Sequence, residues 1–207
     1  DTVRRKQLLE GNWLVQQEGQ VFDEFDPAIH VFDEQPDPRI FKRIILAKDF
    51  GWTAPGCTLV IGDLGGRFMV VDELYEERLI FYDARMEETG QRTWVSEDKR
   101  RNAKWSPHQP SAQGYCDPAE PDNLTRFQRA GIRVSKHRNY GAGEFDEHAR
   151  SVLSGIRTMS ALLHQGRVHV LSKCANLASE FENYVWDTTA AGIQNVQSSL
   201  IGSPGAD

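Results

Sequence analysis

Three β-strand patterns follow one another closely near the start of this chain, and they limit its fold more than any other feature. Residues 41–48 form a run rich in β-branched side chains, and two further apolar runs cover residues 57–62 and 67–72. The turn between the last two runs contains Gly65 and Gly66, which can adopt the positive φ angles of a hairpin. The pattern therefore predicts an antiparallel, three-stranded start to a sheet.

Helix and strand patterns alternate after this start. The predicted elements are an interrupted helix within 79–105, a strand at 113–117, a helix at 121–130, a strand at 132–134, a helix at 146–165, a strand at 167–171 and an amphipathic helix through 177–185. A hairpin followed by β/α alternation predicts an α/β domain with a mixed central sheet and helices on both faces.

Length and composition favour one globular domain. A chain of 207 residues is long enough to bury a real core. Residues 1–38 keep no period for long, so we expect an extended lead-in before a domain over residues 39–207. The sequence shows no apolar run of the ~20 residues that span a bilayer, and no secretory signal, so we expect a cytosolic protein with no membrane partner. The three cysteines are widely spaced, which favours reduced thiols over disulfides or a zinc module.

The net charge of −6 is unfavourable for a nucleic-acid-binding protein, because contacts to phosphates usually require an excess of basic residues. This objection weakens if some of the carboxylates surround divalent cations, since a bound metal ion inverts the local field.

Two aspartates occupy positions that suit a metal centre. Asp49 follows an apolar run and precedes Gly51, and Asp117 ends a later predicted strand. Ligands in open α/β sheets bind at the carboxyl ends of strands, where hard carboxylate oxygens suit Mg²⁺ or Mn²⁺. The alternative is that each aspartate only begins a turn or caps a helix. Spacing alone leaves both interpretations open.

Several segments resemble the nuclease domain of viral DNA-packaging terminase large subunits. Residues 47–55 are similar to the opening strand of that domain, and residues 68–75 to its third strand. Most specific is Tyr-Cys-Asp-Pro-Ala-Glu-Pro at 115–121, which is similar to the segment carrying the second catalytic aspartate of the family. Residues 168–186 resemble the closing strand and helix, and residues 9–22 resemble the linker from the motor domain.

This resemblance implies a ribonuclease H-like fold and an endodeoxyribonuclease that uses two divalent ions, Mg²⁺ or Mn²⁺. Asp49 would bridge two ions roughly 3.5–4 Å apart, and Asp117 would hold one of them. The third carboxylate of the family lies in a C-terminal Asp-His-x-x-Asp-Ala segment. We expect either Asp207 to be the first residue of that segment or the ligand to lie beyond it. Glu73 is a candidate supporting acid, although a role on the surface or behind the ligands fits it equally well.

The resemblance also implies partners. We expect the domain to cut concatemeric double-stranded phage DNA with little base preference in the host cytoplasm. The sequence has no phosphate-binding loop, so the ATPase would belong to another part of the full-length chain. The small terminase subunit and the portal protein would be further partners. The candidate DNA contacts are basic residues, which fit an ordinary solvated surface equally well: Lys99, Arg100, Arg101, Lys104, Lys136 and Arg138.

Two other functions remain open. A non-catalytic module that binds DNA or the portal would agree with the acidic charge and the uncertain third ligand. Another ribonuclease H-like nuclease or a transposase would share the fold, but the Asp-Pro-Ala-Glu-Pro segment at 117–121 favours a terminase.

Overall fold

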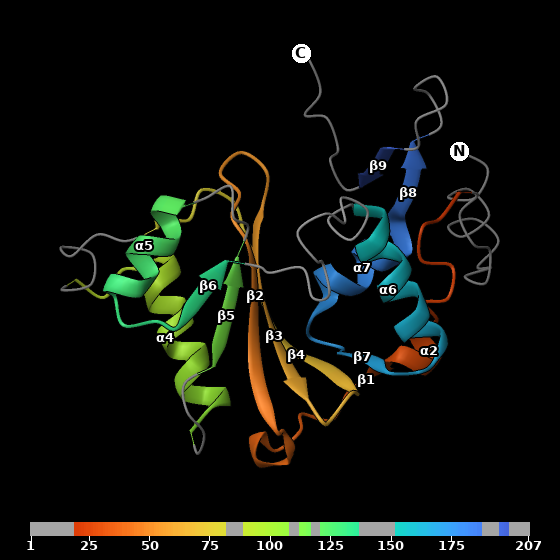
Figure 1. Cartoon of the computed structure of the whole chain (residues 1–207), viewed down its shortest axis with the longest axis horizontal. Helices are drawn as coiled ribbons and strands as arrows, with labels where there is room; N and C mark the ends of the chain where they lie inside the picture. Colours follow the sequence, from red (N-terminus) through yellow and green to blue (C-terminus); the bar gives the residue numbers. More distant parts are fainter. Residues whose placement is uncertain are drawn as a thin grey trace, which may run out of the picture.

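A seven-stranded sheet forms the centre of the protein (Figure 1). The computed structural model describes residues 19–81, 89–107, 112–116, 121–136, 152–187 and 195–198. The strands are β1 (Val31–Phe32), β2 (Arg43–Asp49), β3 (Gly56–Asp63), β4 (Phe68–Glu76), β5 (Gln113–Cys116), β6 (Val134–Lys136) and β7 (Val168–Leu171). Their order in the sheet is β1-β7-β4-β3-β2-β5-β6. Neighbouring strands are parallel, except that β3 is antiparallel to β2 and β4.

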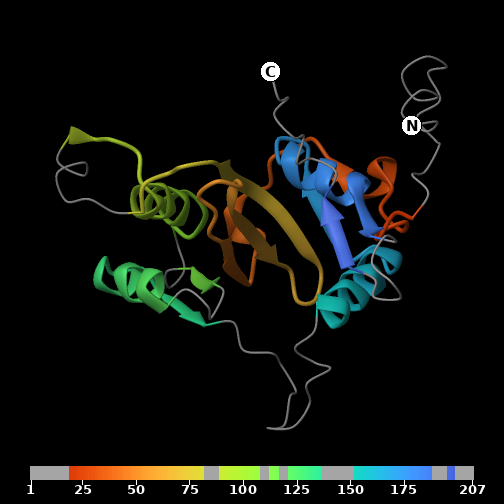
Figure 2. The ribbon, with the colours of Figure 1, turned by 90° about the horizontal axis from the view of Figure 1, so that it is seen from above.

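Helices cover both faces of this sheet, as Figures 1 and 2 show. The helices are α2 (Pro27–His30), the 3-10 turn η1 (Pro38–Ile40), α4 (Trp94–Trp105), α5 (Pro121–Arg129), α6 (Val152–His164) and α7 (Ala175–Asn183). Trp105 of α4 and Phe127 of α5 belong to the cores on one face, whereas Leu163 of α6 and Phe181 of α7 belong to the core on the other. The prediction of a mixed sheet between helices is confirmed.

The order of elements from β2 to α7 agrees with the prediction, and local signals explain several boundaries. Gly65 and Gly66 have φ angles of 95° and 99°, so the β3–β4 turn uses the freedom that only glycine has without strain. Thr93 and Ser96 form a capping box that starts α4. The strand predicted at 132–134 is shifted, since β6 begins at Val134. Part of the helix predicted at 146–165, residues 146–151, lies outside the described ranges.

Residues 19–38 pack into the domain and do not run across its surface as an extended lead-in. Phe25 is 5% exposed and stacks on Phe181 with ring centroids 4.9 Å apart. Val31 and Phe32 form the edge strand β1, which pairs with β7. This segment therefore belongs to the core and to the sheet.

A two-stranded ladder follows α7 and was not predicted. The helix ends at Asn183, and β8 (Tyr184–Asp187) pairs with β9 (Asn195–Ser198) in antiparallel fashion. Gln20 also forms a bridge to Val185. None of the helices in the described ranges combines the length and apolar character that a membrane span requires.

A cluster of charged side chains lies between α4 and the sheet. The Glu97 carboxylate accepts hydrogen bonds from Arg92, Arg100 and Arg101. Burial raises the pKa of Glu97, but these three guanidinium groups outweigh it and hold the pKa at about 2. The carboxylate therefore remains charged in the folded protein through most of the acid range.

This lowered pKa predicts a loss of stability in acid. The stabilisation from Glu97 is fully present above its ordinary pKa of 4.5 and is lost as the pH falls towards about 2. Urea unfolding at pH 6 and pH 3 is expected to show a smaller stability difference for Glu97→Gln than for the parent protein. An equal pH dependence in both proteins would contradict this assignment.

Candidate metal centre

Asp49 is the last residue of β2, and its side chain is exposed at the end of an interior strand of the sheet. The neighbouring strand β5 runs parallel to β2, and both point towards the same edge of the sheet (Figure 1). Their last register pair joins Lys48 to Cys116, the residue before Asp117. Asp117 itself lies outside the described residues, as does Asp207.

Acidic groups surround the end of β2 on the face of the sheet that α7 covers. Cys57 of β3 is the register partner of Asp49, and Tyr75 of β4 is the next partner across. Burial raises the pKa of the Cys57 thiol to about 12, and the charges of Glu73, Asp49 and Glu180 raise it further. A thiol this reluctant to ionise reports a negative potential at this position.

The Tyr75 hydroxyl lies in the same negative field. It donates a 3.1 Å hydrogen bond to Glu180 Oε1 on α7. Burial, followed by the charge of Glu180 and this hydrogen bond, raises the pKa of Tyr75 to about 12. The phenol therefore stays protonated at neutral pH and ties β4 to α7.

The donor chemistry at the end of β2 suits a hard divalent cation. Asp49 offers exposed carboxylate oxygens in a negative field, which Mg²⁺ or Mn²⁺ prefers to nitrogen or sulfur ligands. Among the described residues, no group of three or more His, Cys, Asp or Glu side chains is placed to hold a metal ion. A complete ligand set would therefore need Asp117 or other residues outside those ranges.

Glu73 has a different position from the one expected. It lies in β4, which β3 separates from β2, so Glu73 is not on a strand next to Asp49. Its carboxylate accepts hydrogen bonds from the backbone amides of Asn176 and Leu177, both at 3.0 Å, and from the Asn176 side chain at 2.9 Å. Cys174 makes no side-chain cap, so Glu73 satisfies the free amides at the start of α7 from across the sheet.

These contacts predict that Glu73→Gln costs stability and not cleavage. An amide has only one acceptor oxygen, so it cannot serve both backbone N–H groups. Loss of a cap typically costs about 1 kcal/mol. Urea unfolding should show this loss, while plasmid cleavage in Mn²⁺ at a temperature where the variant is folded should proceed at the parent rate. A large fall in cleavage by the folded variant would make Glu73 a metal-supporting acid again.

The candidate DNA contacts divide by exposure. Lys99 and Arg100 are exposed on α4, although Arg100 also pairs with Glu97 at 2.9 Å. Arg101 is only 3% exposed and bonds Glu97 and the backbone oxygen of Glu73, so its interpretation as a phosphate contact is wrong.

The remaining candidate contacts lie on or beyond the end of α4. Lys104 is partly exposed, with its ammonium 3.6 Å from Asp72 and 4.8 Å from the centre of the Trp105 ring. The side chain of Lys136 and all of Arg138 lie outside the described residues. Two of the six basic residues, Lys99 and Arg100, thus remain as exposed candidates, and Lys104 is a partly neutralised third.

A buried ion pair behind Asp49 was missed by the sequence analysis. Lys48 of β2 pairs with Asp98 of α4, and neither side chain is exposed. The signal was available, because Ile44, Leu46 and Lys48 alternate along one face of the strand. A lysine at the third such position predicts either an exposed strand end or a buried partner.

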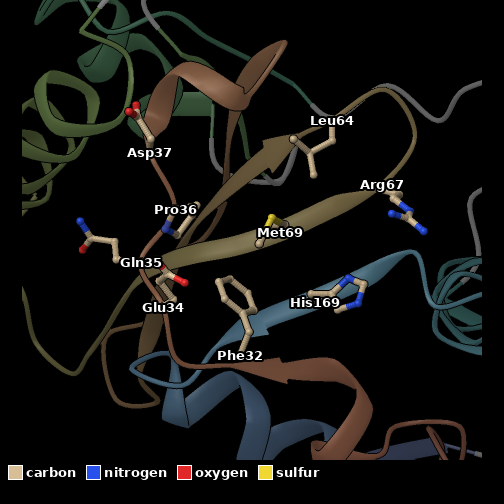
Figure 3. Close-up of a pocket in the computed structure, with 9 residues that line it drawn as sticks. All are labelled: Phe32, Glu34, Gln35, Pro36, Asp37, Leu64, Arg67, Met69 and His169. Carbon is tan, nitrogen blue, oxygen red and sulfur yellow. The ribbon is translucent and has the colours of Figure 1, made fainter.

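A pocket of about 480 Å³ lies at the opposite end of the sheet (Figure 3). Phe32 and Met69 contribute its apolar wall, and Arg67 and His169 lie beside them. The β3–β4 turn that borders this pocket is next to the start of β2, whereas Asp49 ends that strand. The pocket is therefore separate from the candidate metal centre.

Comparisons with known proteins identify the fold. The match to a full-length large terminase from a thermophilic bacteriophage has a TM-score of 0.63 and 21% identity, over 86% of this chain and 41% of that one. The P22 large terminase nuclease domain matches with a TM-score of 0.57 and 17% identity, over 84% of this chain and 82% of that domain. The fold is that of a large terminase nuclease domain.

The nuclease domain of the large terminase from thermophilic phage G20c, solved with bound magnesium, also matches this terminase nuclease fold. Its TM-score is 0.58 at 15% identity, over 90% of this chain and 91% of that one. The ribonuclease H-like prediction is thereby confirmed. The chain spans about two fifths of the full-length large terminase that it matches. No family model matches the sequence, and neither does any curated protein.

Proposed function

We propose that this protein is the metal-dependent endonuclease domain of a phage terminase large subunit, which cuts concatemeric double-stranded DNA during genome packaging. The observation that carries this proposal is the register of β2 and β5, whose last pair is formed by the residues that precede Asp49 and Asp117. Carboxylates that follow adjacent parallel strands emerge at one edge of the sheet, where α/β proteins bind ligands. The terminase nuclease fold and the negative field at Asp49 support the same function.

In this proposal Asp49 and Asp117 hold Mg²⁺ or Mn²⁺, with Asp207 or a residue beyond it as the third ligand. Two ions held there would supply an activated water and would stabilise the leaving 3′ oxygen. The carboxylates bind as ions, so their task needs no raised pKa. Tyr75 and Glu73 hold α7 beside the centre through their bonds to Glu180 and to the amides of the helix.

The proposed substrate and partners follow from the same likeness. Double-stranded DNA would approach the exposed end of β2, with Lys99 and Arg100 as candidate contacts to its phosphates. Few base contacts are expected, so cutting should show little sequence preference. The ATPase domain of the same full-length chain, the small terminase subunit and the portal protein complete the proposed packaging machinery, which would work in the cytoplasm of the infected host.

Asp117→Asn tests the part of the site that the sequence alone supports. The amide keeps the side-chain shape but removes the charge that offsets a divalent ion, so plasmid cleavage in Mn²⁺ should be abolished. The melting temperature without metal should stay level or rise, because one of two repelling carboxylates has lost its charge. Added Mn²⁺ should raise the melting temperature of the parent through preferential binding to the folded state, and that of the variant much less.

Plasmid incubated with the parent protein and Mn²⁺, with and without a chelator, is the necessary control. A parent protein that binds DNA but never cuts it would favour the non-catalytic module. A variant that cuts at the parent rate would remove Asp117 from the site and leave the choice of nuclease open.

A further inference from the structure

A buried ion pair lies directly behind the candidate metal centre. Lys48 Nζ donates to Asp98 Oδ2, and both side chains are fully buried. Lys48 immediately precedes Asp49, and its register partner Cys116 immediately precedes Asp117. Successive side chains of a strand point to opposite faces, so Lys48 points towards α4 while Asp49 points towards the face that α7 covers.

The lysine connects several elements at this point. Its ammonium lies 4.9 Å from the centre of the Phe127 ring in α5. A Cβ at Gly114 of β5 would lie 3.3 Å from Lys48 Cε, so the glycine leaves room for the lysine stem. Through Asp98 the same side chain reaches α4. The pair therefore joins the ends of β2 and β5 to both helices on this face.

Stability does not account for this arrangement. Within the described part of the chain, Asp98 Oδ1 is buried without a hydrogen-bond partner. So is Thr58 Oγ1, on the register partner of Lys48 in β3. Buried charges and unpaired polar atoms cost free energy, and apolar side chains of similar volume are often equally or more stabilising. The ion pair therefore has a role other than stability.

We propose that the Lys48–Asp98 pair positions the metal ligands, an inference that rests on the proposed function. Two carboxylates that converge on one point repel each other when no cation is bound, so other contacts must fix the strand ends that carry them. A charge-assisted hydrogen bond fixes a direction as well as a distance, whereas apolar packing fixes mainly volume. Lys48 and Asp98 would touch neither metal nor DNA, and would act through Asp49 and Asp117.

The test replaces the pair by apolar side chains in Lys48→Met/Asp98→Leu. Its matched control is Arg43→Gln, which breaks an ion pair with Asp63, 2.7 Å long, at the other end of β2. Mn²⁺ affinity is measured from the electron paramagnetic resonance signal of free Mn²⁺, well below the melting temperature, so that every sample is folded. The double variant should keep the parent melting temperature without metal and bind Mn²⁺ about tenfold more weakly. Arg43→Gln should bind as the parent does.

Asp98→Asn is the second variant, because it keeps the side-chain shape and an acceptor oxygen for Lys48 if the double variant does not fold. It should show the same weakening of Mn²⁺ affinity, and a higher Mn²⁺ concentration for half-maximal cleavage. Parent-like Mn²⁺ affinity in a folded variant would overturn the positioning role alone. A parent protein that neither binds Mn²⁺ nor cuts DNA would overturn the proposed function, and the positioning role with it.

Discussion

Asp49→Asn is expected to abolish cleavage of plasmid DNA in Mn²⁺ while leaving the protein folded. A metal ion contributes several kcal/mol of charge stabilisation to a transition state, and each ~1.4 kcal/mol changes a rate tenfold. Loss of the ligand proposed to bridge two ions should therefore slow cutting by at least about a hundredfold. The exposed position of Asp49 means that the substitution removes no core packing.

The stability of this variant separates a lost ligand from a damaged fold. Asp49, Glu73 and Glu180 all act on the Cys57 thiol through their charge, so neutralising Asp49 relieves repulsion. The melting temperature without metal should stay level or rise, and the rise on adding Mn²⁺ should be much smaller than in the parent.

Glu34→Gln is the matched control, because Glu34 is an exposed carboxylate beside the pocket at the opposite end of the sheet. It should cut at the parent rate and show the parent response to Mn²⁺. Parent-like cleavage by Asp49→Asn would exclude Asp49 from the metal centre and would weaken the nuclease proposal itself.

The strand order could be predicted because its signals are local. Gly65 and Gly66 mark a tight turn, and a tight turn makes the flanking strands neighbours in the sheet. The β/α alternation after residue 105 likewise leaves few arrangements of a parallel sheet. The end of β2 at Asp49 was visible for the same reason, since an apolar run stops there and a glycine follows within two residues.

Elements that depend on contacts distant in sequence could not be predicted. Tyr184 and Val185 continue the helical spacing of Leu177 and Phe181, so periodicity assigned them to the last helix. Pairing with β9 and the bridge to Gln20 make them a strand instead. Phe25 shows the same limit, because nothing near it in the sequence indicates that it stacks on Phe181.

The site was predicted in part for similar reasons. Glu73 was placed beside β2 because strand adjacency was read without the hairpin, although the hairpin itself puts β3 between them. Arg101 was read as one of a basic run, but helical spacing from Trp94 through Asp98 to Trp105 places it on the buried face of α4. That spacing was a signal in the sequence that the charge pattern concealed.

Asp98→Ala is expected to lower the free energy of unfolding by about 3–5 kcal/mol, because it leaves the Lys48 ammonium buried without its partner. This is a large share of the ~5–15 kcal/mol that stabilises a typical domain. Burial raises the pKa of Asp98 and lowers that of Lys48, although each partner's charge opposes the shift, so the loss of either charge is strongly felt by the other. Urea unfolding of the parent and the variant measures the difference, provided that both show the same dependence on urea concentration.

Arg39→Ala gives the scale for this loss, since the pair of Arg39 with Asp37 is largely exposed and such pairs contribute about 0–1 kcal/mol. Lys48→Met/Asp98→Leu should recover most of the stability that Asp98→Ala loses, because it removes both charges together and fills the space with apolar atoms. A loss below about 1 kcal/mol in Asp98→Ala would show that the Lys48 ammonium reaches water or another acceptor. In that case the lysine would not hold the ends of β2 and β5 against α4, and the convergence of Asp49 with Asp117 would have to depend on the backbone hydrogen bonds between the two strands.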